Sequence, residues 1–506
     1  MLVNLLKYFL LLFVCLILYY IFPKKTRWIV LLICSLLYYY LLSGNLMLPI
    51  IFSAFSIYLG GIGINAVNNR KLNIDDKNLK RKFKNKNKRL KKIILLIVLS
   101  INIGILIYLK YYNFILFSIK NVFDIGKISP KEIVLPLGIS YYTLMAISYI
   151  TDVYRSKYKA INNPFKVLLY LIFFPSVQEG PINRFDDVSS KLYEGNKFNY
   201  NNICIGVLLI LWGLLKKMVI ADRIGIYVSN TFGVSNGIVS LLSVIFYTIQ
   251  LYAEFSGFID MAMGGAKLFG IDLSANFKRP FFSRNVEEFW RRWHITLGTF
   301  LKDYVFYPIS LSRVSMKLSK FNNKHFSKHL SKFFTSAFPL FFVWFLNGLW
   351  HGASSKYIIY GLYYYVIMMI GLLIEPLFNK ININKKWLNT VKIMRTWIFV
   401  MIGMTIFRAT SIHEAFNVVK SIFYVSSDNI LNFGLTSIDF IIILIFVIVL
   451  FFIGFIEEKG ENVSSIVING SSSKKYFVYY ILIMIIIIFG IYGPGYNASD
   501  FIYGQF

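Results

Sequence analysis

Cysteine, histidine and acidic residues are all scarce in this chain of 506 residues, and each scarcity limits the kinds of functional site that the protein can contain. The three cysteines, Cys15, Cys34 and Cys204, lie in apolar stretches without the spacing of a metal or redox site, so we interpret them as small core residues. Aspartate and glutamate number 24 against 54 lysines and arginines. Two of the five histidines, His294 and His351, lie within or beside membrane-length apolar runs, where an ionisable group is costly unless it has a role.

Hydrophobic residues make up 57% of the chain, and its mean hydropathy of +0.60 exceeds what a soluble globular domain can bury. The sequence predicts an all-α polytopic membrane protein, a single domain of residues 1–506 with about eleven to thirteen transmembrane helices. The stretch 164–181, interrupted by proline and glycine, is typical of a re-entrant segment, and a break within 235–263 is left open. The predicted spans lie near 3–22, 28–43, 46–66, 93–118, 133–151, 203–221, 235–263, 334–350, 357–378, 394–410, 438–456 and 476–494.

The formal net charge of +30 is concentrated in short segments beside the apolar runs. This is the positive-inside pattern of a membrane protein, so we expect a lipid bilayer around the chain and no nucleic acid as a partner. Placing the basic segments in the cytoplasm puts both the N-terminus and the C-terminus on the outer side of a cell membrane. The basic segments are 24–27, 70–92, 154–157, a Lys-rich loop at 317–332, 385–392 and 474–475.

Two unusual segments interrupt the apolar pattern. Residues 287–294 read Glu-Glu-Phe-Trp-Arg-Arg-Trp-His, and residues 347–352 read Asn-Gly-Leu-Trp-His-Gly. The first segment predicts one amphipathic helix that begins after Ser283 or Asn285 and has Arg291 and His294 beside its apolar face. Its arginines have the geometry to hold phosphate or carboxylate by paired hydrogen bonds. The apolar face comprises Val286, Trp290, Trp293 and Leu297.

Further motifs extend through the region 105–410, and together with the two segments they resemble the membrane-bound O-acyltransferase (MBOAT) family. The likeness is to the bacterial branch that includes the membrane protein of alginate O-acetylation. One departure is Glu254, which precedes Phe255-Ser256-Gly257 where that branch usually has aspartate. The further motifs are Lys110–Phe114, Leu135–Ser140, Ser148–Tyr149, Asp152–Arg155, Phe173–Pro175, Gly180–Ile182, Gly213–Lys217, Ala221–Arg223 and Phe255–Gly257.

The resemblance implies an MBOAT fold around a tunnel, with His351 as the catalytic histidine and His294 as a second catalytic residue that shapes the meeting place of donor and acceptor. Imidazole, with a pKa near neutrality, is a suitable base for acyl transfer from a thioester to a hydroxyl. From the residues alone, a histidine that only hydrogen-bonds to neighbouring backbone is equally open. No metal is expected, because neither histidine has acidic or cysteine partners at ligand spacing. The candidate tunnel or substrate-binding residues are Trp290, Arg291, Arg292, Trp293, Asn347, Trp350, Glu254 and Ser256.

The C-terminal segment 438–506 consists of two further predicted spans and a tail on the outer side. Residues 501–506 read Phe-Ile-Tyr-Gly-Gln-Phe, which is similar to the ending of this branch and of the small partner protein of teichoic acid D-alanylation. The resemblance implies Tyr503 as a covalent acyl relay, for which a phenol is a plausible acceptor. An aromatic anchor at the membrane interface is the alternative.

The function expected from the resemblance is transfer of an acetyl or other short acyl group from a cytoplasmic thioester across the membrane, for O-acetylation of an exported cell-surface polysaccharide. Acetyl-CoA, or an acyl-carrier thioester, is the expected donor, and no permanently bound cofactor is expected. The expected partners are an exported SGNH-type acetyltransferase and the polysaccharide synthesis machinery. Two alternatives stay open: D-alanyl transfer to teichoic acid, and a non-catalytic transporter of a polysaccharide precursor.

Overall fold

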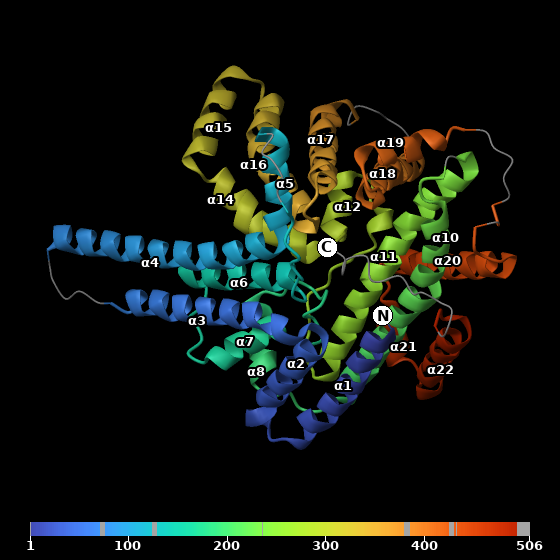
Figure 1. Cartoon of the computed structure of the whole chain (residues 1–506), viewed down its shortest axis with the longest axis horizontal. Coiled ribbons are helices and arrows are strands. Elements are labelled where there is room, and N and C mark those ends of the chain that lie inside the picture. Colours follow the sequence, from blue (N-terminus) through green and yellow to red (C-terminus); the bar gives the residue numbers. More distant parts are fainter. Residues whose placement is uncertain are drawn as a thin grey trace. The chain divides into compact units, whose positions relative to one another are not determined.

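The computed structural model describes residues 2–70, 76–123, 129–234, 236–378, 385–424, 430–431 and 433–492 (Figure 1). Within these residues every regular element is a helix and no strand is formed, which confirms the all-α prediction. The chain divides into two compact units. The N-terminal unit comprises Leu2–Val207 and Ala262–Ser274, and the C-terminal unit comprises Leu208–Met261 and Ala275–Phe506.

The N-terminal unit is built mainly from eight helices, and α3, α4 and α6 pack against one another within it (Figure 1). A buried polar contact joins α3 to α4, where the Asn102 side-chain amide donates to Ser56 Oγ at 2.9 Å. Hydrogen bonds of this kind hold apolar helices together where lipid supplies no hydrophobic drive. The helices are α1 (Leu2–Ile21), α2 (Arg27–Ser43), α3 (Leu48–Asn68), α4 (Lys77–Leu106), α5 (Tyr112–Phe123), α6 (Ile139–Tyr154), α7 (Pro164–Ile172) and α8 (Phe185–Tyr193).

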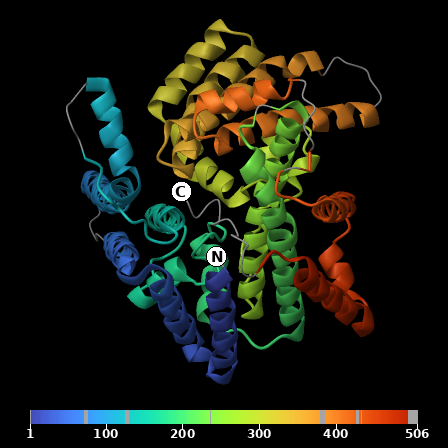
Figure 2. The ribbon, with the colours of Figure 1, turned by 45° about the vertical axis from the view of Figure 1, so that its right-hand side comes forward.

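The C-terminal unit carries both histidine segments, and α15 to α18 follow one another in it as neighbouring helices (Figure 2). Helices α9 (Tyr200–Leu214) and α11 (Gly237–Leu268) contribute residues to both units. A π-helical segment, η4 (Leu215–Ala221), continues α9 into α10. The remaining helices are α10 (Asp222–Thr231), α12 (Val286–Arg292), α13 (Ile295–Leu301), α14 (Tyr307–Ser310), α15 (Arg313–His325), α16 (Lys328–His351), α17 (Ser355–Phe378), α18 (Lys385–Arg408), α19 (Ile412–Ser421), α20 (Ser437–Glu458), α21 (Val463–Asn469) and α22 (Ser472–Phe489).

Among the described residues, nine helical stretches are long and apolar enough to cross a membrane, and the apolar helix Leu5–Ile21 is shorter. One of the nine, Lys24–Asn68, contains both α2 and α3. Every apolar run predicted from the sequence overlaps a helix. The chain is therefore a multi-pass membrane protein.

Three local predictions need correction or refinement. The span predicted near 133–151 becomes helical only at Ile139, because Gly138 has a φ of +66° and a Cβ there would lie 2.1 Å from the carbonyl oxygen of Val177. No break occurs near 235–263, since α11 is one continuous helix. The Lys-rich loop predicted at 317–332 is instead mostly helical, within α15 and the first turn of α16.

Helices α9 and α11 approach each other at a pair of glycines. A Cβ on Gly213 would lie 2.5 Å from the carbonyl oxygen of Gly257, and a Cβ on Gly257 would lie 2.8 Å from that of Gly213. Small residues at such a crossing allow backbones in a membrane to pack closely. The same stretch of α11 carries Glu254 and Ser256, so this crossing fixes their distance from η4.

We expect Gly257→Ala to destabilise the protein by about 1–3 kcal/mol, because the added methyl group forces α9 and α11 apart. Thermal unfolding of the detergent-solubilised chain measures the effect. Gly371→Ala is the matched control, since a Cβ at Gly371 would meet nothing within 4 Å. Equal unfolding midpoints for the two variants would contradict the close crossing.

Candidate active site at His294 and His351

His351 is the last residue of α16 and is 2% exposed. Its imidazole lies edge to face with the rings of Tyr360 of α17, at 5.6 Å between centroids, and Phe407 of α18, at 5.2 Å. The helices come this close because Gly348 faces α17, where a Cβ would lie 2.3 Å from the carbonyl oxygen of Tyr357. Gly348 thus allows α16 and α17 to approach each other, so that His351 lies among aromatic rings.

His294 occupies a break between α12 and α13, with φ 46° and ψ 51° in the left-handed region. The single amphipathic helix predicted across this segment is therefore wrong. Asn276 accounts for the break: its carbonyl oxygen accepts from the Ile295 N–H at 3.0 Å, and its Oδ1 accepts from the Thr296 N–H at 3.0 Å and the Thr296 hydroxyl at 2.6 Å. These bonds replace helical ones and hold His294 at the N-cap of α13.

Trp350 connects the two histidines. Its ring lies 5.2 Å from the His294 ring and 5.0 Å from the His351 ring, between centroids. Phe255 of α11 contacts His294 from another direction, at 4.9 Å. Two histidines that are 57 positions apart in the sequence are thereby brought to one buried aromatic cluster.

Burial lowers the pKa of His294 to about 3. The ring is 2% exposed, and the cost of placing a charge there favours the neutral imidazole. At neutral pH, His294 is therefore an uncharged hydrogen-bonding group.

The predicted tryptophans and arginines of α12 have distinct surroundings. Trp290 packs edge to face on Trp344 at 5.1 Å, which joins α12 to α16. Trp293 is fully buried among the aromatic residues that precede and form α12. Arg292 makes the paired contact expected of a guanidinium, but with Glu458 of α20 at 2.9 and 3.0 Å. Arg291 is exposed and pairs with Glu287.

Glu254 and Ser256 belong to a buried charge cluster beside η4. Lys217 Nζ lies 2.5 Å from Glu254 Oε1 and 2.6 Å from Asp222 Oδ1. Lys216 Nζ donates to Ser256 Oγ at 2.9 Å and pairs with an aspartate of α11. Glu254 thus neutralises the buried Lys217, and Ser256 orients Lys216.

Asn347 lies one helical turn before His351 on α16 and is buried. Its side-chain nitrogen has no hydrogen-bond partner among the described residues. Residues one turn apart on a helix share a face, so Asn347 is a candidate donor toward a ligand at His351. Tyr503, the predicted relay, lies outside the described residues.

Sequence reasoning missed the role of Asn276. A single polar residue in a loop does not reveal its role in the sequence. The fold determines that residues 295 and 296 become the partners of Asn276. Lys217 carried a stronger signal, since a charge inside an apolar run requires a partner. No group of three or more metal-ligating side chains occurs in the described part of the chain.

Comparison with known proteins places this geometry in a family. The model of the membrane-bound O-acyltransferase family, MBOAT, matches residues 131–413, which include both histidines and Trp350. The chain belongs to this family. It is 32% identical over 334 residues to the probable alginate O-acetylase of Pseudomonas putida, a match that covers 65% of this chain and 64% of that protein.

More distant relatives act on other polymers according to their names. The peptidoglycan O-acetyltransferase of Helicobacter pylori is 28% identical over 363 residues, covering 65% of this chain and 64% of the relative. The teichoic acid D-alanyltransferase of Bacillus subtilis is 29% identical over 296 residues, covering 56% of this chain and 71% of the relative. These three relatives are thus named for three different acceptors.

We expect Asn276→Ala to lower acyl-transfer turnover by about 10²-fold, because loss of the Thr296 contacts releases the backbone that positions His294. Thr296→Val removes only the hydroxyl bond and should cost less. Turnover and thermal unfolding of both variants check this. An Asn276→Ala protein with native turnover would show that His294 is positioned without Asn276.

The low pKa of His294 also predicts acid sensitivity. As the pH falls below 6.5, the unfolded chain gains a proton at this residue, whereas the folded chain gains it only at about pH 3. The free energy of unfolding therefore decreases as the pH falls through this window, by up to about 1.4 kcal/mol per pH unit. His294→Asn should flatten the pH dependence of unfolding between pH 6.5 and 4. The native chain is the reference; an unchanged slope in His294→Asn would refute the assignment.

Proposed function

We propose that this protein is a membrane O-acyltransferase that takes an acetyl or other short acyl group from a cytoplasmic thioester, with acetyl-CoA as donor, for O-acetylation of an exported cell-surface polysaccharide. The observation that carries the proposal is the convergence of His294 and His351 on the ring of Trp350 inside a matched MBOAT domain. Both histidines are 2% exposed, and a site that excludes bulk water protects a thioester from hydrolysis.

In the proposed reaction, His351 is the general base. The acceptor hydroxyl oxygen attacks the thioester carbonyl carbon while His351 removes the hydroxyl proton, and the carbon–sulfur bond then breaks. The proton passes from His351 to the departing thiolate, so the ester and a free thiol are the products. His351 stands at the C-terminal end of α16, where the helix dipole stabilises the positive charge that develops on the ring.

His294 has the complementary role of an uncharged partner. Its low pKa keeps it neutral, and its position at the N-cap of α13 disfavours a positive charge. A neutral imidazole can donate one hydrogen bond to the carbonyl oxygen of the acyl group as negative charge develops there. The Asn347 side-chain nitrogen is the second proposed donor.

The proposed direction of transfer follows from charge. The Lys-rich segment 317–332 is assigned to the cytoplasm, which places both termini outside and the protein in the cytoplasmic membrane. Helix α16 begins in that basic segment and carries His351 at its other end, about 36 Å away at 1.5 Å per residue. An acyl group received at His351 is thus already displaced toward the outer side.

Tyr503 is proposed as the relay on that outer side, because its phenol can accept the acyl group as an ester before a second enzyme consumes it. That second enzyme is proposed to be an exported SGNH-type acetyltransferase acting with the polysaccharide synthesis machinery. The match to a teichoic acid D-alanyltransferase supports a second candidate, D-alanyl transfer by the same histidine chemistry.

Acyl transfer from radiolabelled acetyl-CoA to the protein in lipid nanodiscs tests the proposal. We expect a labelled native chain, with labelling reduced about 10²–10⁴-fold in His351→Ala and His351→Gln because the base is lost. Tyr503→Phe should lose the label, and His413→Ala, an exposed histidine, should keep it.

Equal behaviour of the native chain, His351→Ala and Tyr503→Phe would refute either the donor or the enzyme assignment. Repeating the assay with a D-alanyl carrier thioester separates the two acyl groups. A transporter would retain partial function in His351→Gln, so loss of function in this near-isosteric variant argues against transport alone.

A further inference from the structure

A lysine lies beside the histidine cluster at the start of α17. The ring of Tyr357 packs against Gly352, the residue after His351, and a Cβ on Gly352 would lie only 2.3 Å from that ring. The Lys356 ammonium lies over the same ring, 4.8 Å from its centroid. It also donates a hydrogen bond to the carbonyl oxygen of Ala409, just after α18, at 2.8 Å. One aromatic ring therefore separates Lys356 from the backbone beside His351.

An arginine approaches the cluster from the end of α18. Arg408 follows Phe407, whose ring contacts that of His351 at 5.2 Å between centroids. The Arg408 guanidinium lies over the rings of Phe232 and Tyr247, with its Cζ 5.5 and 5.9 Å from their centroids. A second cation is thus fixed next to a residue that contacts the candidate base.

These two positive charges are only partly neutralised. Lys356 and Arg408 are close enough to repel each other electrostatically. Neither forms an ion pair with an acidic side chain in the described part of the chain. Glu414 attracts both, but its carboxylate accepts hydrogen bonds from the backbone N–H and the hydroxyl of Thr410. The three charged groups together leave a net positive charge beside His351.

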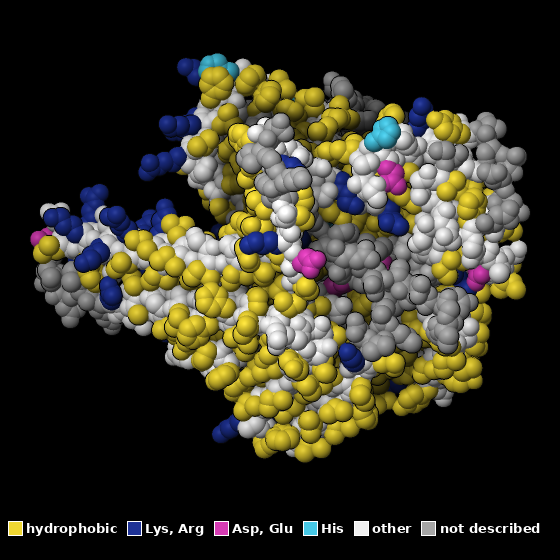
Figure 3. Space-filling model, in the orientation of Figure 1, with side chains coloured by type: hydrophobic (Ala, Val, Ile, Leu, Met, Phe, Trp, Pro, Cys, Tyr) yellow, Lys and Arg dark blue, Asp and Glu magenta, His cyan; other side chains and the backbone are white. Residues whose placement is uncertain are grey.

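The neighbouring helices supply no acidic residue to offset this charge. Helices α16 and α18 contain no aspartate or glutamate, and neither does the stretch Ser355–Ile374 of α17. Figure 3 shows lysine and arginine side chains at the surface beside α18 and α19. An acyl group with an ammonium would therefore find no carboxylate on these stretches to pair with.

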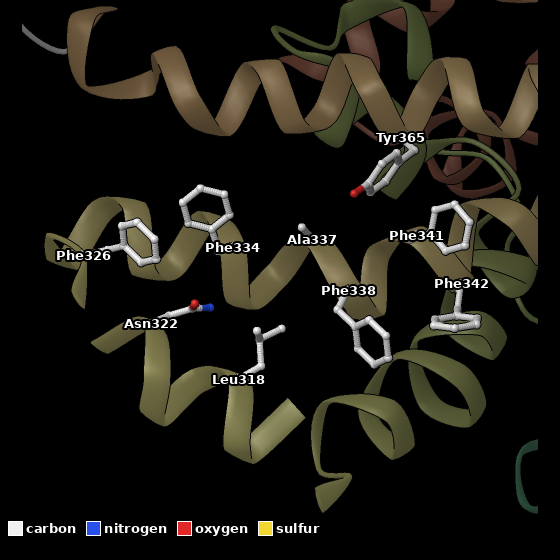
Figure 4. Close-up of a pocket in the computed structure, with 9 residues that line it drawn as sticks. All are labelled: Leu318, Asn322, Phe326, Phe334, Ala337, Phe338, Phe341, Phe342 and Tyr365. Carbon is white, nitrogen blue, oxygen red and sulfur yellow. The ribbon is translucent and has the colours of Figure 1, made fainter. Parts of the chain in front are cut away.

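The charge belongs to the His351 end of α16 and α17. Further from His351, these two helices and α15 border a cavity of about 480 Å³ (Figure 4). None of the nine residues that line this cavity is charged. Lys356 and Arg408 are thus a local feature of the candidate site.

We propose that Lys356 and Arg408 make the candidate site selective for neutral acyl groups, such as acetyl and propionyl, over acyl groups that carry an ammonium, such as D-alanyl. This inference rests on the acyl transfer proposed above and changes only the acyl group, so the bonds made and broken stay the same. Two fixed cations repel an ammonium on the acyl group, and the repulsion increases as the base gains its proton.

The surroundings of the two cations preserve this repulsion. Both side chains are partly buried, which limits screening by water and salt. Aromatic rings can bind an ammonium over their faces. Here, however, the two cations already occupy such positions on three of the nearby rings.

The test compares radiolabelled propionyl-CoA and glycyl-CoA as donors for the protein in lipid nanodiscs. The two acyl groups have equal numbers of non-hydrogen atoms and differ in a terminal methyl against a terminal ammonium. At about pH 6.5 the glycyl amine is protonated, since α-amino groups have a pKa of about 7.7–8.0. We expect the native chain to transfer propionyl at least about tenfold faster than glycyl.

Lys356→Gln/Arg408→Gln should lower this preference at least about fivefold, chiefly through faster glycyl transfer. Lys356→Arg/Arg408→Lys keeps both charges and should retain the preference. The matched control is Arg313→Gln/Lys317→Gln on α15, which removes one arginine and one lysine that are exposed, and it should leave the preference unchanged. The preference is a ratio within each protein, so a lower amount of folded protein does not alter it.

Equal rates for the two donors in the native chain, a native preference in Lys356→Gln/Arg408→Gln, or equal losses in the two glutamine double variants would each overturn the proposal. Where Lys356→Gln/Arg408→Gln does not fold, Arg408→Gln alone keeps the Lys356 bond to Ala409 and should lower the preference at least about twofold. A native chain that transfers neither acetyl nor propionyl would refute the acyl-transfer function, and this inference with it.

Discussion

The candidate site depends on the hydrogen bonds that two oxygen atoms of Asn276 accept from Ile295 and Thr296. In a regular helix through residues 286–301, His294 would lie on the same face as Trp290, one turn further along. With the hydrogen bonds of Asn276, the chain turns at His294, and the imidazole meets Trp350 and Phe255. A loop residue thus directs a side chain that a regular helix would have placed elsewhere, at the cost of a left-handed backbone at a non-glycine residue.

Neutralisation of buried charge is the second constraint on this fold. Lys217 is held by Glu254 and Asp222, Arg223 bonds to Asp439, and Arg292 bonds to Glu458. These pairs join η4 to α11, α10 to α20, and α12 to α20. Breaking the fully buried pairs of Lys217 leaves one charge uncompensated, which costs about 3–5 kcal/mol, so these pairs specify which helices can be neighbours. The pairs of Arg223 and Arg292 are partly exposed and contribute less. Three of these four acidic residues thus connect helices that are distant from one another along the chain.

The fold was largely predictable because apolar runs of membrane length leave few alternatives to helices. Helix ends were less predictable: Gly138 delays α6 because of a contact with Val177, which is distant along the chain. In the site, scarcity identified His294 and His351, whereas Asn347 was named only through the resemblance, and its position one helical turn before His351 comes from the structure. The assignment of Glu254 and Ser256 to a tunnel rested on resemblance, whereas their contacts with Lys217 and Lys216 depend on the crossing of α9 and α11 at two glycines. No pattern within a short stretch of sequence predicts where two helices cross.

The two histidines differ most in their relation to the helices that carry them. His351 ends a helix of 24 residues, and the partial negative charge there favours a transient imidazolium. His294 precedes a helix and is buried, so it remains uncharged above about pH 3. The two histidines contact the same tryptophan ring but differ in how readily each takes up a proton. In other enzymes, such a difference between two titratable groups assigns one as the base and the other as the hydrogen-bond donor. If both rings gained protons readily, their repulsion across Trp350 would oppose the reaction. In the proposed reaction, the helix break at His294 therefore supports proton removal at His351 as well as the positioning of His294.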